Sequence, residues 1–190
     1  YENGQLQVEK NVKLDLNVPY GFDYVKEEGL WKEYYENGQL KLEGNYEDGK
    51  GNGLFKKYFE SGQLEYEGNY KDGKQEGLWK GYHKNGNLIF EGNFKNDIRE
   101  GLVKEYFENG QLFLVGQFNY GKQEGSWKYY YKSGQLKLEG NYKYGERDGL
   151  HKSYYESGNL EQVVKYKNGK PKGRIKVYQN GKVKVRSKVR

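Results

Sequence analysis

Apolar and polar residues follow a pattern along the chain that repeats every 24 residues. The pattern is clearest in residues 29–52, GLWKEYYENGQLKLEGNYEDGKGN. The glycine that opens this stretch recurs at the start of seven units: Gly29, Gly53, Gly77, Gly101, Gly125, Gly149 and Gly173. A fixed period of this length is typical of a repeat protein. Positions within a unit are numbered below from this glycine, which is position 1.

Each unit is predicted to contain two β-strands. Apolar residues at positions 12, 14 and 18 are spaced by multiples of two, which indicates strands rather than helices. Asn-Gly or Ser-Gly at positions 9 and 10 is a strong hairpin signal, and a second turn is predicted at pairs such as Asp48-Gly49. We therefore expect an all-β fold, an elongated single-layer antiparallel β-meander of 24-residue hairpin repeats that advances about 10 Å per unit.

The turn at positions 9 and 10 determines the predicted register. A two-residue turn pairs position 7 with 12, 5 with 14 and 3 with 16. The aromatic residue at position 3, such as Trp31, then covers the glycine at position 16 of its own unit, such as Gly44. The lysine at position 4 lies opposite the glutamate at position 15, and such a pair contributes about 0.2–1 kcal/mol. A three-residue turn with a bulge, which shifts the register by one residue, is the alternative.

The chain divides into three parts on this pattern. Residues 1–28 are interpreted as irregular N-terminal half-repeats, residues 29–172 as six 24-residue hairpin repeats, and residues 173–190 as a basic C-terminal partial repeat or cap. Within the first part, alternate residues occupy the apolar positions of a degenerate unit: Leu16, Val18, Tyr20 and Phe22. The glycine pattern is broken at Asp97 in a turn and at Val164 in position 16.

The net charge of +6 is concentrated at the C-terminal end. Residues 165–190 contain 11 basic and no acidic side chains, whereas the rest of the chain has 22 basic and 27 acidic ones. Alternating cations on a last strand keep an exposed sheet edge from pairing with other chains, which is the role we expect. The alternative is binding to an anionic surface through Lys182, Lys184, Arg186, Lys188 and Arg190.

No set of residues indicates catalysis. The chain has no Cys, which excludes disulfides and thiolate metal sites. His83 and His151 stand where other units carry aromatic or apolar residues, so they are interpreted as packing residues. The glycines lead into strands and not into helices, unlike phosphate-binding loops. We expect no enzymatic activity, no cofactor and no metal, and no apolar run reaches transmembrane length.

Two sets of residues are candidate binding surfaces. Position 6 is Tyr in all seven units, and we expect these side chains to stack across the strands, the alternative being an aromatic platform for sugars or peptides. The units that open at Gly77 and Gly101 replace charged residues by apolar ones. In the preferred register the replacements form an exposed apolar patch, which predicts a partner-binding site made by Ile89, Phe113, Val115, Tyr82, Tyr106 and Ile98.

The glycine and aromatic spacing resembles the MORN repeat. The residues that carry the resemblance are Leu42, Gly44, Tyr46, Gly49 and Gly53, with their equivalents 24 residues later. The half-unit W-K-x-Y-Y-x-N-G-x-L is similar to the bacterial variant of this repeat. The resemblance implies a meander of hairpins with a binding or scaffolding role, protein partners and, for some members, phospholipid membranes, export or an antitoxin-like role.

We therefore expect a non-enzymatic repeat scaffold for protein–protein interaction, from a bacterial exported or surface-associated protein. The sequence begins at Tyr1 and contains no Met, so we interpret it as a trimmed piece without its signal segment. The alternatives are a module that binds cell-wall glycan or an anionic lipid surface, and an antitoxin-like neutralising protein. No specific nucleic-acid binding is expected.

Overall fold

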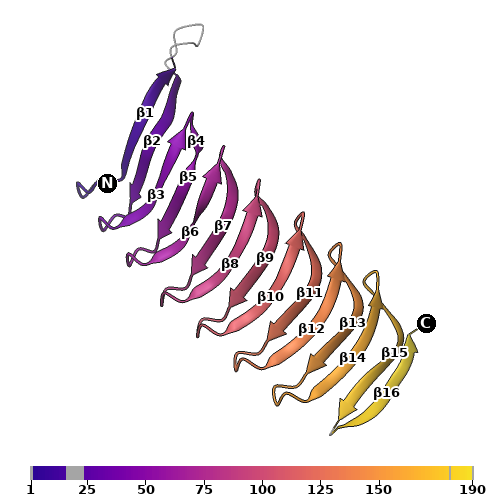
Figure 1. Cartoon of the computed structure of the whole chain (residues 1–190). Helices are drawn as coiled ribbons and strands as arrows, with labels where there is room; N and C mark the ends of the chain where they lie inside the picture. Colours follow the sequence, from indigo (N-terminus) through magenta and orange to yellow (C-terminus); the bar gives the residue numbers. More distant parts are fainter. Residues whose placement is uncertain (1, 16–23, 180, 190) are drawn as a thin grey trace. The chain divides into compact units, whose positions relative to one another are not determined.

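The computed structural model describes residues 2–15, 24–179 and 181–189. This part of the chain contains β-strands and no helix, and the strands form one open sheet of sixteen antiparallel strands (Figure 1). The all-β antiparallel fold predicted from the 24-residue repeat is therefore confirmed. The half-repeat predicted around Leu16, Val18, Tyr20 and Phe22 lies outside the described residues.

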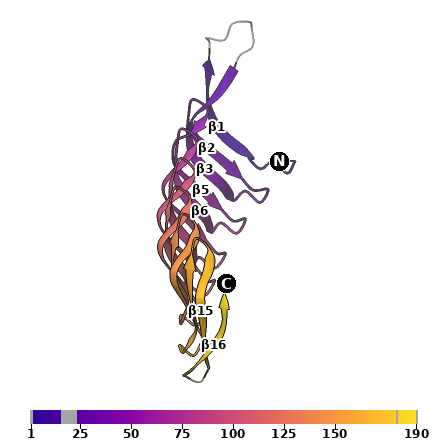
Figure 2. The same ribbon diagram turned by 90° about the vertical axis from the view of Figure 1, so that its right-hand side faces the viewer.

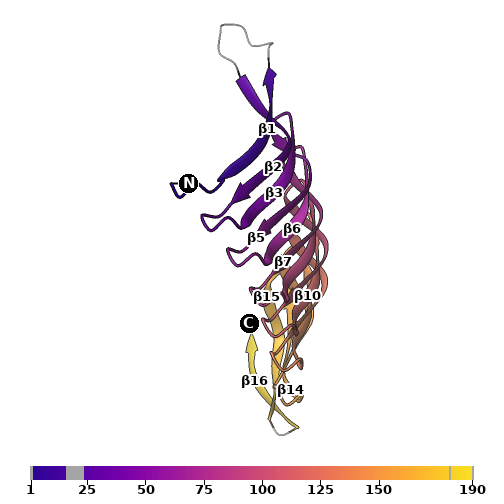
Figure 3. The same ribbon diagram turned by 90° about the vertical axis from the view of Figure 1, so that its left-hand side faces the viewer.

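Contacts between residues divide the chain into two compact units. From here on, a unit is one of these two parts, and each 24-residue segment is called a repeat. The first comprises Tyr1–Asn87 and Phe94–Asp97. Its strands are β1 (Val8–Asp15), β2 (Tyr24–Tyr34), β3 (Leu40–Glu47), β4 (Lys50–Gly51), β5 (Gly53–Tyr58), β6 (Leu64–Lys71) and β7 (Lys74–Tyr82). The short β4 pairs with β3. In the side views of Figures 2 and 3, β1, β2, β3, β5 and β6 follow one another in a single layer.

The second unit comprises Leu88–Asn93 and Ile98–Arg190. Strand β8 (Leu88–Lys95) contributes residues to both units, and the remaining strands belong to the second: β9 (Ile98–Tyr106), β10 (Leu112–Asn119), β11 (Lys122–Tyr130), β12 (Leu136–Lys143), β13 (Glu146–Tyr154), β14 (Leu160–Lys167), β15 (Lys170–Gln179) and β16 (Lys182–Val189). In each unit, loops of two kinds alternate between the two ends of the strands (Figure 1).

The turns at positions 20 and 21 are two-residue hairpin turns, as predicted. Both central residues have positive φ, for example 50° at Asp48 and 76° at Gly49, which a type I′ turn requires. Asp97 stands in place of the glycine with φ 67°. Its Oδ1 accepts a hydrogen bond from the backbone N–H of Gln75 at 2.7 Å, and its own N–H donates to the Gln75 carbonyl. These bonds hold an aspartate in a conformation that favours glycine.

The loop around positions 9 and 10 has three residues, so the preferred two-residue turn is wrong. The N–H of Tyr35 donates to the carbonyl of Gln39 at 2.8 Å, which pairs position 7 with position 11. Gly38 has φ 81° and Asn37 has no positive φ, whereas a type I′ turn needs both. The Asn37 side chain instead accepts from the N–H of Gln39 and donates to the carbonyl of Glu60 in the next repeat.

A bulge at position 13 restores the predicted register farther from the loop. In the β9–β10 pair, Tyr106 faces Leu112 and Glu105 faces Leu114, which leaves Phe113 without a partner. Positions 5, 4 and 3 then pair with 14, 15 and 16, as the preferred register predicted. Each of the two predicted registers is therefore right in part. The loop has the three residues of the alternative, and the extra residue of the bulge then returns the strands to the preferred register.

A larger bulge moves the side chain at position 3 onto the preceding repeat. The β6–β7 pairing leaves Gly68 alone opposite residues 77–79, and Gly77 has φ 74°. A Cβ added to Gly68 would lie 2.1 Å from Cδ2 of Trp79. Position 3 does pair with position 16 of its own repeat, as Phe55 does with Gly68, but its ring covers the glycine of the preceding repeat. The prediction that the ring covers its own repeat's glycine is therefore wrong.

The side chain at position 3 and the residue at position 16 of the preceding repeat are matched in size. A ring covers a glycine in these further pairs: Phe55 on Gly44, Trp127 on Gly116 and His151 on Gly140. Where position 3 is Val103, a Cβ on Gly92 would lie 3.3 Å from its Cγ2, close to ordinary contact. Val164 replaces the glycine, and the following repeat carries the aliphatic Ile175 at position 3.

This match predicts different costs for the same substitution at two glycines. Gly116→Ala places a Cβ 2.2 Å from Trp127 Cδ2, so we expect a loss of more than about 2 kcal/mol in the free energy of unfolding. Gly92→Ala should cost less than about 1 kcal/mol, since Val103 needs to shift only slightly. Neither glycine has a positive φ, so backbone strain does not contribute. Urea unfolding of the two variants measures the difference.

The control is the same glycine beside a smaller side chain. In a Trp127→Val background, Gly116→Ala should cost no more than Gly92→Ala does in the native chain. Equal losses for the two glycines in the native background, or an unchanged loss for Gly116→Ala beside Val, would contradict the size match.

Candidate functional site

One face of the sheet, called the ring face here, carries the side chains of positions 3, 14 and 18. In the second unit Trp127 is 2% exposed, and its ring packs at 5.2 Å from Phe118 and 6.0 Å from Tyr142, measured between centroids. In the first unit Phe55 packs between Tyr46 and Tyr70. Rings from neighbouring repeats therefore bury one another, and they form the core of this thin sheet.

The opposite face, called the charge face here, carries positions 2, 4, 6, 15 and 17. Its tyrosines at position 6 donate hydrogen bonds to the glutamate at position 15 of the preceding repeat. Tyr58 donates to Glu43 at 2.7 Å and Tyr154 to Glu139 at 2.8 Å. Lys152 at position 4 is paired with the same Glu139 at 3.2 Å. Positions 4 and 15 of one repeat do face each other across the strands, as predicted, but this ion pair joins Lys152 to the glutamate of the preceding repeat.

These hydrogen bonds fix the protonation states of the charge face. Burial and the bond to Glu43 raise the pKa of Tyr58 to about 12, and burial and the bond to Glu139 raise the pKa of Tyr154 to about 12. The bond from Tyr154 is also the main cause that lowers the pKa of Glu139. The hydroxyls are therefore donors and the carboxylates acceptors at neutral pH. The tyrosines of position 6 therefore have a structural role, but through hydrogen bonds to glutamates and not through the stacking of their rings across the strands that the sequence predicted.

The residues predicted to form a single partner-binding patch lie on different faces. Phe113 occupies the bulge and packs against Phe107 at 5.1 Å and Tyr129 at 6.4 Å, so its side chain belongs to the ring face. Tyr106 donates to Glu91 on the charge face, and Val115 pairs there with Lys104. The prediction that these residues share one face is wrong because the bulge at position 13 interrupts the alternation of side chains.

The other members of the predicted patch have different surroundings. Tyr82 donates to Glu67 at 2.9 Å. Ile89 occupies the bulge position of its repeat and is 38% exposed. Ile98 is 47% exposed, and its Cγ2 lies near the turn at Gly121. Ile89 and Ile98 are therefore exposed apolar side chains, and their part in a binding site stays a prediction.

A row of half-exposed leucines on the charge face was not predicted. It occupies position 2, where the side chain pairs across the strands with position 17. The leucines are 45–53% exposed: Leu30, Leu54 and Leu78 in the first unit, and Leu102 and Leu150 in the second. Ser126 takes the same position in one repeat. The signal was present in the sequence as a recurring Gly-Leu pair, which could have been found once the face of position 2 was known.

Basic residues gather on the charge face near the C-terminal end. Lys165 pairs with Lys172 across β14 and β15, and both are exposed. Arg174 and Lys176 follow on β15 and are also exposed. No carboxylate is paired with these four residues, called the basic group here, in the described part of the chain. In the earlier repeats the position of Lys165 carries Asn or Gln, and the position of Lys172 carries mostly acidic residues. The position of Arg174 carries Leu or Ser there, and only the position of Lys176 carries Lys as well.

The residues predicted for anionic-surface binding lie on the neighbouring strand. Lys182 and Lys184 are exposed on β16, which pairs with β15 as the last strand of the sheet. The side chains of Arg186 and Lys188, and the whole of Arg190, lie outside what the structure describes. The alternating tail therefore does form an edge strand.

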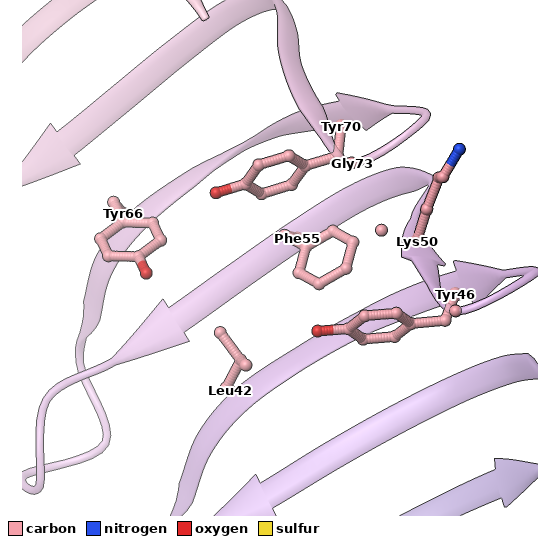
Figure 4. A pocket seen from close by; sticks show the side chains of 9 residues that line it. Leu42, Tyr46, Lys50, Phe55, Tyr66, Tyr70 and Gly73 are labelled. Carbon is pink, nitrogen blue, oxygen red and sulfur yellow. The ribbon is translucent and has the colours of Figure 1, made fainter. Parts of the chain in front are cut away.

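A pocket opens on the ring face of the first unit (Figure 4). It has a volume of about 410 Å³ and is lined by Leu42, Tyr46, Gly49, Lys50, Gly51, Phe55, Tyr66, Tyr70 and Gly73. Position 23 explains the opening, because it is Gly51 here and carries a side chain in every other repeat. Arg147, for example, donates from position 23 to the Tyr166 hydroxyl at 3.1 Å.

His151 is used in packing. His151 is 4% exposed and lies between Tyr142 and Tyr166, at 5.3 and 5.0 Å between ring centroids. Burial lowers its pKa, although its Nε2 is bonded to the Asn141 carbonyl at 2.8 Å. A neutral, buried His151 therefore takes the place of the tryptophan found at this position in other repeats.

Among the described residues there is no group of three or more His, Cys, Asp or Glu side chains able to hold a metal ion. In the same part of the chain, no helix has the length and apolar character needed to cross a membrane.

The repeats of this sheet match a known family. The profile of the MORN repeat variant matches six consecutive segments: residues 27–48, 52–72, 75–96, 99–120, 123–144 and 147–168. The chain belongs to the MORN repeat family. MORN repeats are generally non-catalytic scaffold modules that interact with proteins or membranes. No curated protein matches this MORN repeat chain.

Proposed function

We propose that this MORN repeat chain is a non-enzymatic module that binds a protein partner through the leucine row on its charge face. The row carries the proposal because these apolar side chains recur in successive repeats and remain about half exposed. Exposed apolar groups that gather on one surface mark interaction sites. Since each leucine is already about half buried, burying the rest of it in a complex would contribute about 1–1.5 kcal/mol.

The spacing of the row favours a helical partner segment. Leu30, Leu54 and Leu78 occupy the same position in successive repeats of the first unit, and two strands advance a sheet by about 10 Å. Seven residues of an α-helix span about 10.5 Å. A partner helix with an apolar residue every seven positions could therefore contact successive leucines, and the Lys and Glu side chains beside the row would face its polar flanks.

The export and surface association expected from the sequence remain proposals, as do glycan binding and an antitoxin-like role. The leucine row is compatible with either a scaffold or a neutralising protein, because both act by binding another protein.

The test is removal of two leucines from the row. Leu54→Ser with Leu78→Ser should lower the affinity for the partner by at least tenfold, since two buried apolar contacts are lost. Ser126 occupies the same position in a native repeat, so the fold should tolerate the change. The intact chain and the variant are compared as baits in lysate of the source cell, and the affinity of the captured protein is then measured by calorimetry.

The comparison variant is Ile89→Ser with Ile98→Ser, which removes two exposed apolar side chains of the patch predicted from the sequence that do not occupy position 2. If the leucine row and not these isoleucines binds the partner, this variant should retain it. A partner that binds the leucine variant as tightly as the intact chain, with both folded by circular dichroism, would contradict the proposal.

A second candidate function is binding to an anionic lipid surface, and the basic group favours it. Like charges directly opposite each other destabilise a sheet, yet Lys165 and Lys172 form such a pair. No Asp or Glu follows Glu161 in the sequence, so nothing nearby along the chain neutralises this end. Each Lys or Arg near an anionic membrane contributes about 1 kcal/mol to binding.

Charge variants taken from the other repeats test this candidate. Lys165→Asn with Lys172→Glu should weaken binding to phosphatidylglycerol vesicles by about 100-fold, because three units of positive charge are removed. Lys143→Asn with Lys132→Glu removes the same charge from exposed sites in the same unit and should have a much smaller effect. Vesicle co-sedimentation measures both, and equal losses, or no binding by the intact chain at low salt, would reject the site.

A further inference from the structure

The aromatic pocket of the first unit arises from one missing side chain. Position 23 points to the ring face, where it normally lies beside the position-18 ring of the following repeat: Arg99 stacks on Phe118 at 5.5 Å and Arg147 on Tyr166 at 5.2 Å. At Gly51 nothing extends over the ring, and the space between Tyr46 and Tyr70 stays open. The pocket therefore forms where the side chain that covers the position-18 ring in other repeats is missing.

Three rings give the pocket its shape. Phe55 lies between Tyr46 and Tyr70 at centroid distances of 5.4 and 4.9 Å, with interplanar angles of 76° and 77°. In Figure 4 the two tyrosine rings flank Phe55, whose ring presents its flat side between them. Phe55 is only 4% exposed, so it closes the bottom of the pocket, and the partly exposed rings of the two tyrosines form its accessible walls. A volume of about 410 Å³ lies within the range of small-molecule sites, about 300–1,000 Å³.

Polar groups stand at one end of the pocket. The hydroxyls of Tyr46 and Tyr70 point toward the end where Leu42 and Tyr66 lie, whereas the Lys50 side chain at the opposite end directs its ammonium away from Phe55 (Figure 4). No hydrogen bond within the described residues engages the hydroxyl of Tyr46, Tyr66 or Tyr70. Burial raises the pKa of Tyr46 and of Tyr70, so both hydroxyls remain donors at neutral pH.

These features indicate which class of ligand the pocket would bind. The face of an aromatic ring is electron-rich and packs well against C–H groups, whereas the hydroxyls at one end require hydrogen-bonding partners, because leaving them buried and unpaired costs about 1–3 kcal/mol each. A pyranose ring with equatorial hydroxyls has both properties, since its C–H groups form flat apolar faces and its hydroxyls lie around the edge. An aromatic side chain would leave the tyrosine hydroxyls unpaired, and the Lys50 charge disfavours a quaternary ammonium.

We propose that the pocket over Phe55 is a carbohydrate-binding subsite that takes one gluco-configured pyranose unit of a glycan. The sugar packs its C–H groups between the rings of Tyr46 and Tyr70 above the buried Phe55, and its hydroxyls bond the tyrosine hydroxyls at one end of the pocket. The site lies on the ring face, so it does not depend on the leucine row of the charge face. One small polar ligand of this size binds with a dissociation constant on the order of millimolar.

The experiment uses cellotetraose as the probe and the full chain as the receptor. Saturation-transfer difference NMR should detect the sugar, and the backbone amides of Gly49, Gly51 and Gly73 should shift on titration. Gly51→Gln should weaken binding at least tenfold, because the side chain that Gln75 and Gln123 supply in other repeats would fill the pocket. Phe55→Val removes the ring at the bottom of the pocket and should have the same effect, and Val103 shows that the fold accepts Val there.

Leu54→Ser on the charge face is the control and should bind cellotetraose like the native chain, with all variants folded by circular dichroism. Two outcomes would overturn the proposal. One is no binding of cellotetraose by the native chain at concentrations about tenfold above the expected dissociation constant. The other is binding that Gly51→Gln and Phe55→Val leave unchanged. N-acetyltryptophanamide is titrated in parallel, and if it binds while the sugar does not, the pocket holds an aromatic side chain of a partner protein.

Discussion

The contact between the side chain at position 3 and the glycine at position 16 of the preceding repeat is the constraint on which this fold depends. A single-layer sheet has no second layer to cover its apolar residues, so its burial comes from rings that pack across repeats. Trp79 can lie on Gly68 only because the glycine has no Cβ, which would come within 2.1 Å of the ring. The three-residue bulge that opens each repeat directs the ring there.

This constraint separates the two faces by function. On the ring face most side chains are occupied in packing, so a binding site arises only where a repeat omits a side chain, as at Gly51. On the charge face the tyrosine–glutamate hydrogen bonds join the repeats, which leaves position 2 free to vary. The leucine row and the basic group therefore both occur on this face, where the residues can change without loss of the core.

Much of the fold could be predicted from the sequence, because periodic glycines and apolar residues at period two specify a hairpin meander. The two-residue turns at Asp48 and its equivalents followed from local turn chemistry. The three-residue loop at Asn37 was predicted only as the alternative, because the Asn side chain bonds the next repeat, and a contact with a neighbouring repeat is not visible in the local sequence. The consequence was large, since the bulge moved Phe113 to the other face and divided the predicted patch.

The candidate sites were less predictable for a related reason. The pocket depends on Gly51, which in the sequence is one glycine among many, and its effect appears only when the position-23 side chains are seen to cover neighbouring rings. The basic group likewise consists of residues whose shared face depends on the pairing of β14 with β15. The sequence showed the surplus of positive charge but not the strands that carry it.

The most direct test of this account asks which glycine lies under a tryptophan ring. Trp127 pairs across the strands with Gly140 of its own repeat, whereas its ring covers Gly116 of the preceding one. In solution NMR, nuclear Overhauser effects from the Trp127 indole protons should reach the α protons of Gly116, which the ring current should shift upfield. Strong effects to Gly140 instead, with ordinary shifts at Gly116, would contradict the coupling of repeats by rings on glycines.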